Sequence, residues 1–470
     1  MRILSKRVMP FFSLLLLAGC AHYTKPSIQV ETVSYTQMQE KEKSLIPAQM
    51  TDFTLPIVQK LALKNNPDFR SIQFAMDSAR ARYYQSLSFY APTLNAGLSF
   101  SQSFNRTYSS HNTQKTHGQN DSFGPSLSGQ WLIFDCLARE FNVLSSEVGM
   151  DQTQNQIDDA RRLLLRGVAY AYNEVMLNLT QLKIFKAQLE YNKDMLLDAE
   201  KKYKAGTTLL SDVLNFRVAV KNTELSIIET SFSIKANKYI LAGYLGLTDG
   251  TIPDLIRFPE IKVPDEVVMP RVEFYIDMAL QCRPDLKALR DEFQMSKYSY
   301  WTSLSNMGPT ITADYSASYN SGQRLQYGED GYRSSTSSDV GNYNYGIYAN
   351  WNLFDGLYDY NNIKIAIAEM AQADYNQAQT WIGIITDVRT AYENFLSSME
   401  QAKKSKEIAE LTKETRDLVV NEYNAGTALV TRVNEVEKDL VTAQNDLATA
   451  IINISNAKAQ LDAAVFRQVD

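Results

Sequence analysis

Two different periodicities of hydrophobic residues meet near residue 355. From Tyr343 to Leu353 every second residue is apolar, and most of the residues between them are asparagine. This period of two predicts a strand with one apolar and one polar face. Asp355 then suits the N-cap of a helix, because apolar residues recur after it at gaps of four and three. The pattern predicts a strand that continues into a long helix with almost no loop.

The same junction occurs earlier in the chain. Trp-Leu-Ile-Phe-Asp at 131–135 matches Trp-Asn-Leu-Phe-Asp at 351–355, at a spacing of 220 residues. A second pair of motifs, Asn-Pro-Asp-Phe at 66–69 and Arg-Pro-Asp-Leu at 283–286, has a spacing of 217 residues. The sequence therefore predicts an internal tandem repeat, with one body made of two similar halves.

Four strands are expected, two in each half. Alternating segments cover about 92–105, 122–134, 309–320 and 342–354, and each has about the ten residues that a tilted strand needs to cross a bilayer. A half-buried sheet of a soluble protein would show the same alternation. Because the smallest single-chain barrels have about eight strands, four strands cannot enclose a pore, and several chains must share one barrel.

Two further features favour a membrane sheet. The segments between the members of each strand pair, 105–121 and 321–341, are rich in polar residues and glycine, and we expect them to be loops outside the cell. Large aromatic residues gather at one strand end, like the aromatic girdle of a membrane barrel. They are Trp131, Phe134, Tyr348, Trp351 and Phe354.

Long helices make up most of the remaining chain. Helices are expected over about 136–204 and 356–424, and each would be about 100 Å long at 1.5 Å per residue. Apolar residues in the segments after residues 213 and 433 recur at an average period of 3.5, the value of a coiled coil. We expect each long helix to turn back on itself in a hairpin.

Both expected hairpins turn at similar sequence motifs, Tyr-Lys-Ala-Gly-Thr at 203–207 and Tyr-Asn-Ala-Gly-Thr at 423–427. Gly206 and Gly426 suit the left-handed residue that ends a helix. Thr207 and Thr427 follow them, and we expect these threonines to help start the returning helices. The two tips are predicted to lie at the end of the molecule that is farthest from the membrane.

The first residues carry the features of a signal peptide. Arg2, Lys6 and Arg7 precede a short apolar core, and Leu-Ala-Gly-Cys closes it at Cys20. Small residues before a lone cysteine resemble a bacterial lipobox, in which Cys20 becomes the lipid-bearing N-terminus. The alternative is an ordinary secretory signal with a chance cysteine.

The expected organisation has five parts. A signal peptide (1–19) and a polar lipid-anchored arm (20–52) precede the first repeat (53–250). An irregular, proline-containing linker (251–271) joins it to the second repeat (272–470). No apolar run in the sequence is long enough for a membrane helix, so any span is expected to be β.

Composition excludes several function classes. The formal net charge is -6, and cleavage of the signal peptide would leave 44 basic against 53 acidic side chains, which speaks against a nucleic-acid partner. Cys136 and Cys282 stand in unmatched settings, and we expect them to be unpaired. The three histidines, His22, His111 and His117, form no recognisable metal motif. No catalytic constellation, cofactor motif or metal site is expected.

Taken in order, the duplicated motifs resemble the TolC-like outer-membrane efflux proteins, specifically their lipid-anchored branch. The resemblance covers nearly the whole mature chain. It implies a homotrimer in which three chains form a twelve-stranded transmembrane β-barrel on a long α-helical coiled-coil tunnel across the periplasm. It also implies an outer-membrane lipid environment, and an inner-membrane pump and a periplasmic adaptor that dock at the hairpin tips.

The resemblance also indicates a periplasmic gate just beyond the tips. The positions that match are Asp212 in the first half and Arg432 and Glu435 in the second. Arg432 falls where some relatives have aspartate, so it could pair with Asp212 or Glu435 and latch the closed tip. The alternative is that these three residues are solvated charges on the helix surface, which contribute little.

These features predict a passive, gated exit duct for small molecules such as drugs. An alternative within the same family is the outer-membrane duct of a protein secretion system, since the tip residues do not settle the cargo. An alternative of a different class is a surface-anchored coiled-coil structural protein, with β segments that serve only as trimerisation caps.

Overall fold

The computed structural model describes residues 52–108, 115–248, 250–253, 256–259, 269–328, 331 and 333–466. Within these ranges the chain forms helices and one sheet. In chain order the elements are α3 (Leu55–Asn65), α4 (Pro67–Ser88), β1 (Thr93–Tyr108), β2 (Lys115–Phe134), α5 (Ala138–Lys204), α6 (Leu210–Tyr244), α7 (Val272–Cys282), α8 (Pro284–Ser305), β3 (Thr310–Gly328), β4 (Arg333–Asn350), α9 (Tyr358–Asn424) and α10 (Val430–Val465).

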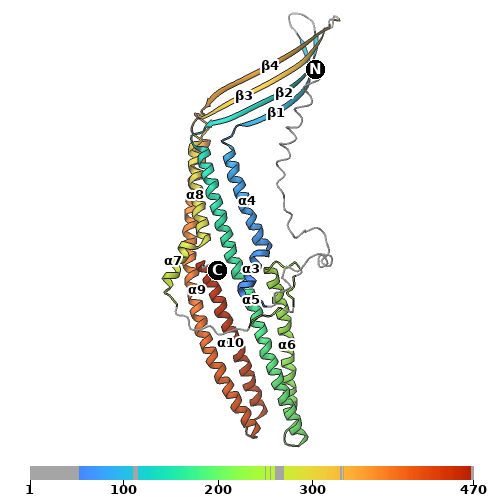
Figure 1. Cartoon of the computed structure of the whole chain (residues 1–470), viewed down its shortest axis with the longest axis vertical. Helices are drawn as coiled ribbons and strands as arrows, with labels where there is room; N and C mark the ends of the chain where they lie inside the picture. The colour runs from blue at the N-terminus through green and yellow to red at the C-terminus, as the bar shows by residue number, and fades with distance from the viewer. Residues whose placement is uncertain are drawn as a thin grey trace.

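The molecule is elongated, with the sheet at one end and two helix hairpins at the other (Figure 1). Helices α5 and α9 each have 67 residues and leave the sheet side of the molecule. They turn back as α6 and α10, while α4 and α8, each of 22 residues, lie beside the parts of α5 and α9 nearest the sheet. The long helices therefore begin and end within two residues of the predicted positions.

The sheet is antiparallel in the order β1-β2-β3-β4. Its pairing covers 105–108 and 115–121 of the first predicted loop and most of 321–328 and 333–341 of the second, so the prediction that these residues form loops was wrong. Their side chains are polar on both faces, which removes the period of two, but backbone pairing with a neighbouring strand needs no apolar face. At the other end the fourth strand stops at Asn350, before the predicted end at 354.

The two strand-to-helix junctions use the same backbone conformation. Leu137 and Leu357 have φ values of 73° and 72°, in the left-handed region, directly before α5 and α9. Asp355 accepts hydrogen bonds from the backbone N–H groups of Tyr358 and Asp359 at 3.0 and 2.8 Å. Asp355 therefore satisfies orphan donors of the first turn, as expected of a capping residue, although the formal N-cap is Leu357.

A buried arginine fixes the first junction. Arg139 donates from Nη1 to the carbonyl of Leu132 at 2.7 Å and from Nη2 to that of Ile133 at 3.0 Å. Its Nε lies 3.3 Å from Asp135, and its guanidinium covers the ring of Tyr90. The side chain thus satisfies carbonyls where β2 no longer pairs with β1, and it ties the start of α5 to the end of the sheet.

The coiled-coil seams are confirmed. On α6 the residues of the predicted stripe, such as Val213, Phe216 and Val220, are buried, and on α10 the stripe that includes Val433 and Leu440 is buried as well. Both cysteines within the described ranges, Cys136 and Cys282, are free, as predicted. Among the helices of the described residues, none is both long and apolar enough to cross a membrane.

Candidate functional site

The hairpin tips are built by a left-handed glycine. Gly206 and Gly426 have φ values of 75° and 82°, as predicted. The backbone N–H of Thr207 donates to the carbonyl of Lys202, and that of Thr427 donates to Glu422. This pattern of bonds satisfies the last carbonyls of α5 and α9 in the manner of a Schellman motif.

The threonines do not start the returning helices as expected. Thr207 Oγ1 and Thr427 Oγ1 each donate at 3.0 Å to the same carbonyl that their backbone N–H contacts. The returning helices start later, after Leu209 and Leu429, neither of which supplies a capping side chain. The threonines therefore close the outgoing helices, because the tight turn places their hydroxyls over the C-terminal carbonyls.

A shared apolar core joins the two hairpins just above the tips. Phe216 of α6 is fully buried, and its ring meets that of Tyr423 of α9 edge-on, with centroids 6.2 Å apart. Val433 and Val436 of α10 belong to the same cluster. Lys202 of α5 places its ammonium 4.6 Å from the centre of the Tyr423 ring. The two hairpins are therefore in direct contact just above their tips.

The predicted gate residues are only partly brought together. Arg432 and Glu435 form an ion pair of 2.6 Å one turn apart on α10, and their side chains are 52% and 59% exposed. Asp212 accepts instead from the hydroxyl of Thr208 at 2.6 Å. Within the described part of the chain, Asp212 is not among the ion-pair partners of Arg432. Such an exposed pair on one helix contributes only ~0.2–1 kcal/mol.

A buried polar cluster above the tips was missed by the sequence analysis. Glu437 of α10 lies 3.8 Å from Arg416 of α9, and Arg416 also pairs with Asp417 at 3.2 Å. The guanidinium of Arg416 lies 5.3 Å from the ring centre of Tyr191 of α5. The cluster therefore joins three helices that belong to both hairpins. The signal that could have revealed it is an acidic residue next to the apolar stripe of α10.

Burial dominates the electrostatics of this cluster. Desolvation raises the pKa of Glu437, and Asp417 adds to the shift, although Arg416 opposes it. Desolvation likewise raises the pKa of Tyr191 to about 12, with Glu437 contributing. Within the described residues, the Tyr191 hydroxyl and one oxygen of Glu437 are buried without a hydrogen-bond partner. This arrangement is costly for the ionised carboxylate, and protonation of Glu437 removes that cost.

Several apolar surfaces stay uncovered in the single chain. On β1, alternate residues including Leu94, Leu98 and Phe100 are more than 70% exposed. Helix α6 carries a second stripe of apolar and lysine side chains at gaps of four and three, on the face away from its hairpin partner. Its exposed apolar members are Leu214, Val218, Leu225, Ile228, Phe232 and Tyr239. Contiguous exposed apolar surface of this kind indicates contact with lipid or with another chain.

Cys20, the predicted lipidation site, and the arm after it lie outside the described residues. In the described part of the chain no group of three or more His, Cys, Asp or Glu side chains could hold a metal ion. The tips consist of glycine turns, buried apolar side chains and a few charged residues.

Comparison with known proteins gives consistent results. Nodulation protein T of Rhizobium leguminosarum bv. trifolii is 22% identical over 484 residues, which cover 97% of this chain and 96% of that protein. The structure of CusC, a protein that forms a transmembrane channel, matches with a TM-score of 0.74 at 17% identity, over 94% of this chain and 98% of CusC. VceC, an outer membrane protein of Vibrio cholerae, matches with a TM-score of 0.71 at 18% identity, over 87% and 95% of the two chains.

These structural likenesses show the fold. The family itself is shown by a sequence profile, that of the outer membrane efflux proteins, which matches residues 58–247 and 275–465. The two matched segments together span most of the chain and include both hairpins. The protein therefore belongs to the outer membrane efflux protein family, the TolC-like channels.

Proposed function

We propose that three copies of this chain form a gated duct through which an inner-membrane pump expels small molecules, such as drugs, across the outer membrane. The observation that carries the proposal is the continuity of the chain from a four-stranded sheet into helices of 67 residues. Such helices are about 100 Å long, which is enough to cross a compartment next to the membrane. Membership of the efflux family supports the direction of transport.

The sheet supports the trimer. Among the described residues, strands β1 and β4 each pair with one strand and therefore present an unpaired edge. Three copies joined edge to edge would give a closed barrel of twelve strands and leave no edge open. The exposed alternate residues of β1, among them Leu94 and Leu98, would then face lipid.

The helices support the same assembly. The second apolar stripe of α6, which includes Leu225 and Phe232, has the period of a coiled-coil seam but no partner within the described chain. Exposed apolar residues also lie along α9, at Ile408, Leu411 and Leu418. A neighbouring copy would cover these surfaces and close the helices into a tunnel.

The equal lengths of matching elements support the tandem duplication. Helices α3 and α7 both have 11 residues, α4 and α8 both have 22, and α5 and α9 both have 67. The family profile also matches the two halves separately. Two similar halves in each of three chains would give the tunnel a near six-fold wall.

The tips are the proposed docking site for a periplasmic adaptor that links the duct to the pump. The α5–α6 and α9–α10 turns lie at the same end of the molecule (Figure 1). They contain Gly206 and Thr207 in the first hairpin and Gly426 and Thr427 in the second. The proposed duct is passive and has only to open, so the energy for transport would come from the pump. At the other end, lipidation of Cys20 would anchor the chain in the outer membrane.

The lipid anchor has a direct test. Cells that express the protein and are fed labelled palmitate should incorporate the label into the wild-type chain and not into a Cys20→Ser variant. Label that persists in the variant would show that the acyl group is attached to a residue other than Cys20.

Channel activity is tested by single-channel recording of the purified protein in planar bilayers, together with drug susceptibility of a deletion strain. We expect stepwise conductance and increased susceptibility. Absence of both would contradict the duct and favour a structural coiled-coil protein. A duct that conducts, but whose loss blocks export of a protein and leaves drug susceptibility unchanged, would instead indicate protein secretion.

The gate is tested at Arg432. If Arg432 only pairs with Glu435 on its own helix, Arg432→Ala should change conductance little, because an exposed pair of this kind contributes little. If Arg432 latches neighbouring tips in the trimer, the variant should raise conductance and antibiotic leakage severalfold. Lys404→Ala is the matched control, since Lys404 and Glu407 form an exposed pair with the same spacing far from the tips. Unchanged values for Arg432→Ala in both assays would contradict the latch.

A further inference from the structure

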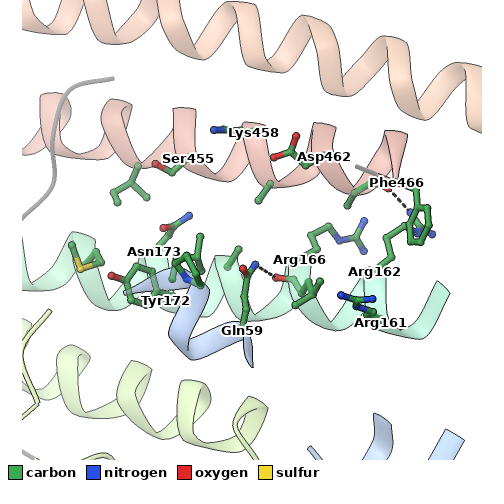
Figure 2. Close-up of a pocket in the computed structure, with 18 residues that line it drawn as sticks. Gln59, Arg161, Arg162, Arg166, Tyr172, Asn173, Ser455, Lys458, Asp462 and Phe466 are labelled. Carbon is green, nitrogen blue, oxygen red and sulfur yellow. Dashed lines mark hydrogen bonds between the residues drawn. The ribbon is translucent and has the colours of Figure 1, made fainter. Parts of the chain in front are cut away.

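A cavity lies where α3, α5 and α10 meet, and the proposed duct makes no use of it. Its volume is about 430 Å³, within the range of small-molecule pockets in proteins, roughly 300–1,000 Å³. Figure 2 shows Arg161 and Arg162 near Phe466 at one end, and Tyr172 and Asn173 towards the other. The cavity therefore has a cationic end and an opposite end of different character.

The end away from the arginines is mainly apolar. Met176, Ala169 and Ile452 line it, together with Ser455 and Lys458 of α10, and the polar groups of Tyr172 and Asn173 are hydrogen-bonded to the protein. The Tyr172 hydroxyl donates to the carbonyl of Phe53 at 3.0 Å, and Asn173 Nδ2 donates to Asn456 Oδ1 at 2.8 Å. A ligand at this end would meet a surface that offers few polar contacts. Burial of its apolar part there would be favourable, because apolar surface is removed from water.

Charge in the cavity is not balanced. Arg161, Arg162 and Arg166 line one end, and Lys458 lies nearer Asn173, against one acidic side chain, Asp462 (Figure 2). Arg162 is buried and compensated, because it pairs with Asp159 at 2.6 Å and caps the end of α10 through the carbonyl of Ala463.

Arg161 and Arg166 differ from Arg162. They are half-buried and line the cavity on either side of Arg162 along α5. Within the described residues, no carboxylate lies within ion-pair distance of Arg161, Arg166 or Lys458. A half-buried guanidinium without a partner favours a bound anion, and a carboxylate matches its fork of N–H donors in two-point contact.

We infer that this cavity binds a single-headed amphiphilic anion, an alkyl monocarboxylate such as a medium-chain fatty acid. Its carboxylate contacts Arg161 and Arg166, and its alkyl chain lies against Ala169, Met176 and Ile452. The site is formed within one chain and does not depend on transport through the duct. It requires both ends of the ligand, because the guanidinium groups select the charge and the apolar end selects the tail.

Equilibrium dialysis of the purified full-length protein against radiolabelled dodecanoate tests this site. The same non-ionic detergent is present on both sides of the membrane, so that partition into micelles cancels. We expect saturable binding of one molecule per chain. Octanoate should bind at least tenfold more weakly, because each buried methylene adds up to about fourfold in affinity. Dodecanol and dodecyltrimethylammonium should not compete.

Two kinds of variant separate the site from unspecific adsorption. Arg161→Gln/Arg166→Gln should weaken dodecanoate binding at least tenfold, whereas Arg70→Gln/Arg82→Gln, at two exposed arginines of α4, should leave it within twofold. Ala459→Trp keeps every arginine and fills the cavity from α10, so it should also abolish binding.

Three results would overturn the inference. The first is wild-type affinity in the variant that lacks both Arg161 and Arg166 while circular dichroism shows an intact fold. The second is equal affinity for dodecyltrimethylammonium, which would indicate an apolar site without charge selection. The third is binding that occurs only after residues 467–470 are removed, which would mean that the end of the chain itself fills the cavity.

Discussion

The contact between the end of α6 and the end of α3 allows a direct test of the packing between these two helices. Gly246 follows α6 with φ of 67°, and a Cβ built there would lie 2.5 Å from the carbonyl oxygen of Asn65. Real Cβ atoms do not approach backbone so closely, so the two segments must separate. Gly250 has φ of 66°, and a Cβ built there has nothing within 4 Å. The two glycines thus share a left-handed φ and differ in the space that the described residues leave around them.

The magnitudes follow from this difference. A left-handed conformation costs an alanine roughly 1–2 kcal/mol, and both Gly246→Ala and Gly250→Ala incur it. Overpacking adds about 1–3 kcal/mol, and only Gly246→Ala incurs that cost. Since about 1.4 kcal/mol corresponds to a factor of ten, the clash should increase local opening by about fivefold to a hundredfold. The effect should reach α3, because the clashing atom belongs to it.

Hydrogen–deuterium exchange on the full-length protein measures this opening. The backbone N–H of Asn66 donates to Ala62 at 2.8 Å, and that of Leu247 donates to Ala242 at 3.0 Å. Gly246→Ala should accelerate exchange at both amides, and Gly250→Ala should leave the Asn66 amide at the wild-type rate. Equal rates at the Asn66 amide in the two variants would refute the packing argument. Acceleration by Gly250→Ala alone would refute it too.

Two further predictions concern the contact between the hairpins. Phe216→Ala should lower the stability of this contact by about 3–5 kcal/mol, because it removes a fully buried ring and its edge-on contact with Tyr423. Proteolysis near the tips should become faster, while Phe232→Ala on the exposed face of α6 should leave its rate unchanged. Burial raises the pKa of Glu437, so the native state binds the proton more tightly than the unfolded chain, and stability of the contact should fall as the pH rises through that raised pKa. Glu437→Gln should remove this pH dependence in thermal unfolding measured across the acidic range, and Arg416 keeps Asp417 as a partner; a slope that persists in the variant would assign the effect to another group.

Only the tertiary structure decided how far the strands extend. Residues such as 115–121 carry polar side chains on both faces, so their sequence resembles a loop, yet their backbone pairs because neighbouring strands are in register. The role of Thr207 was decided in the same way. A threonine at this position suits a helix start, but the turn at Gly206 brings the hydroxyl of Thr207 to the carbonyl of Lys202.

The sequence by itself determined the long helices, their hairpin turns, the number of strands and the coiled-coil seams. These features depend on local causes, namely the period of apolar residues, capping side chains such as Asp355 and the conformational freedom of glycine. The tertiary structure alone revealed the buried cluster of Tyr191, Arg416 and Glu437 and the cavity beside Arg161 and Arg166. Each of these sites joins helices that lie far apart in the chain, and no local pattern records which surfaces will meet when the hairpins pack.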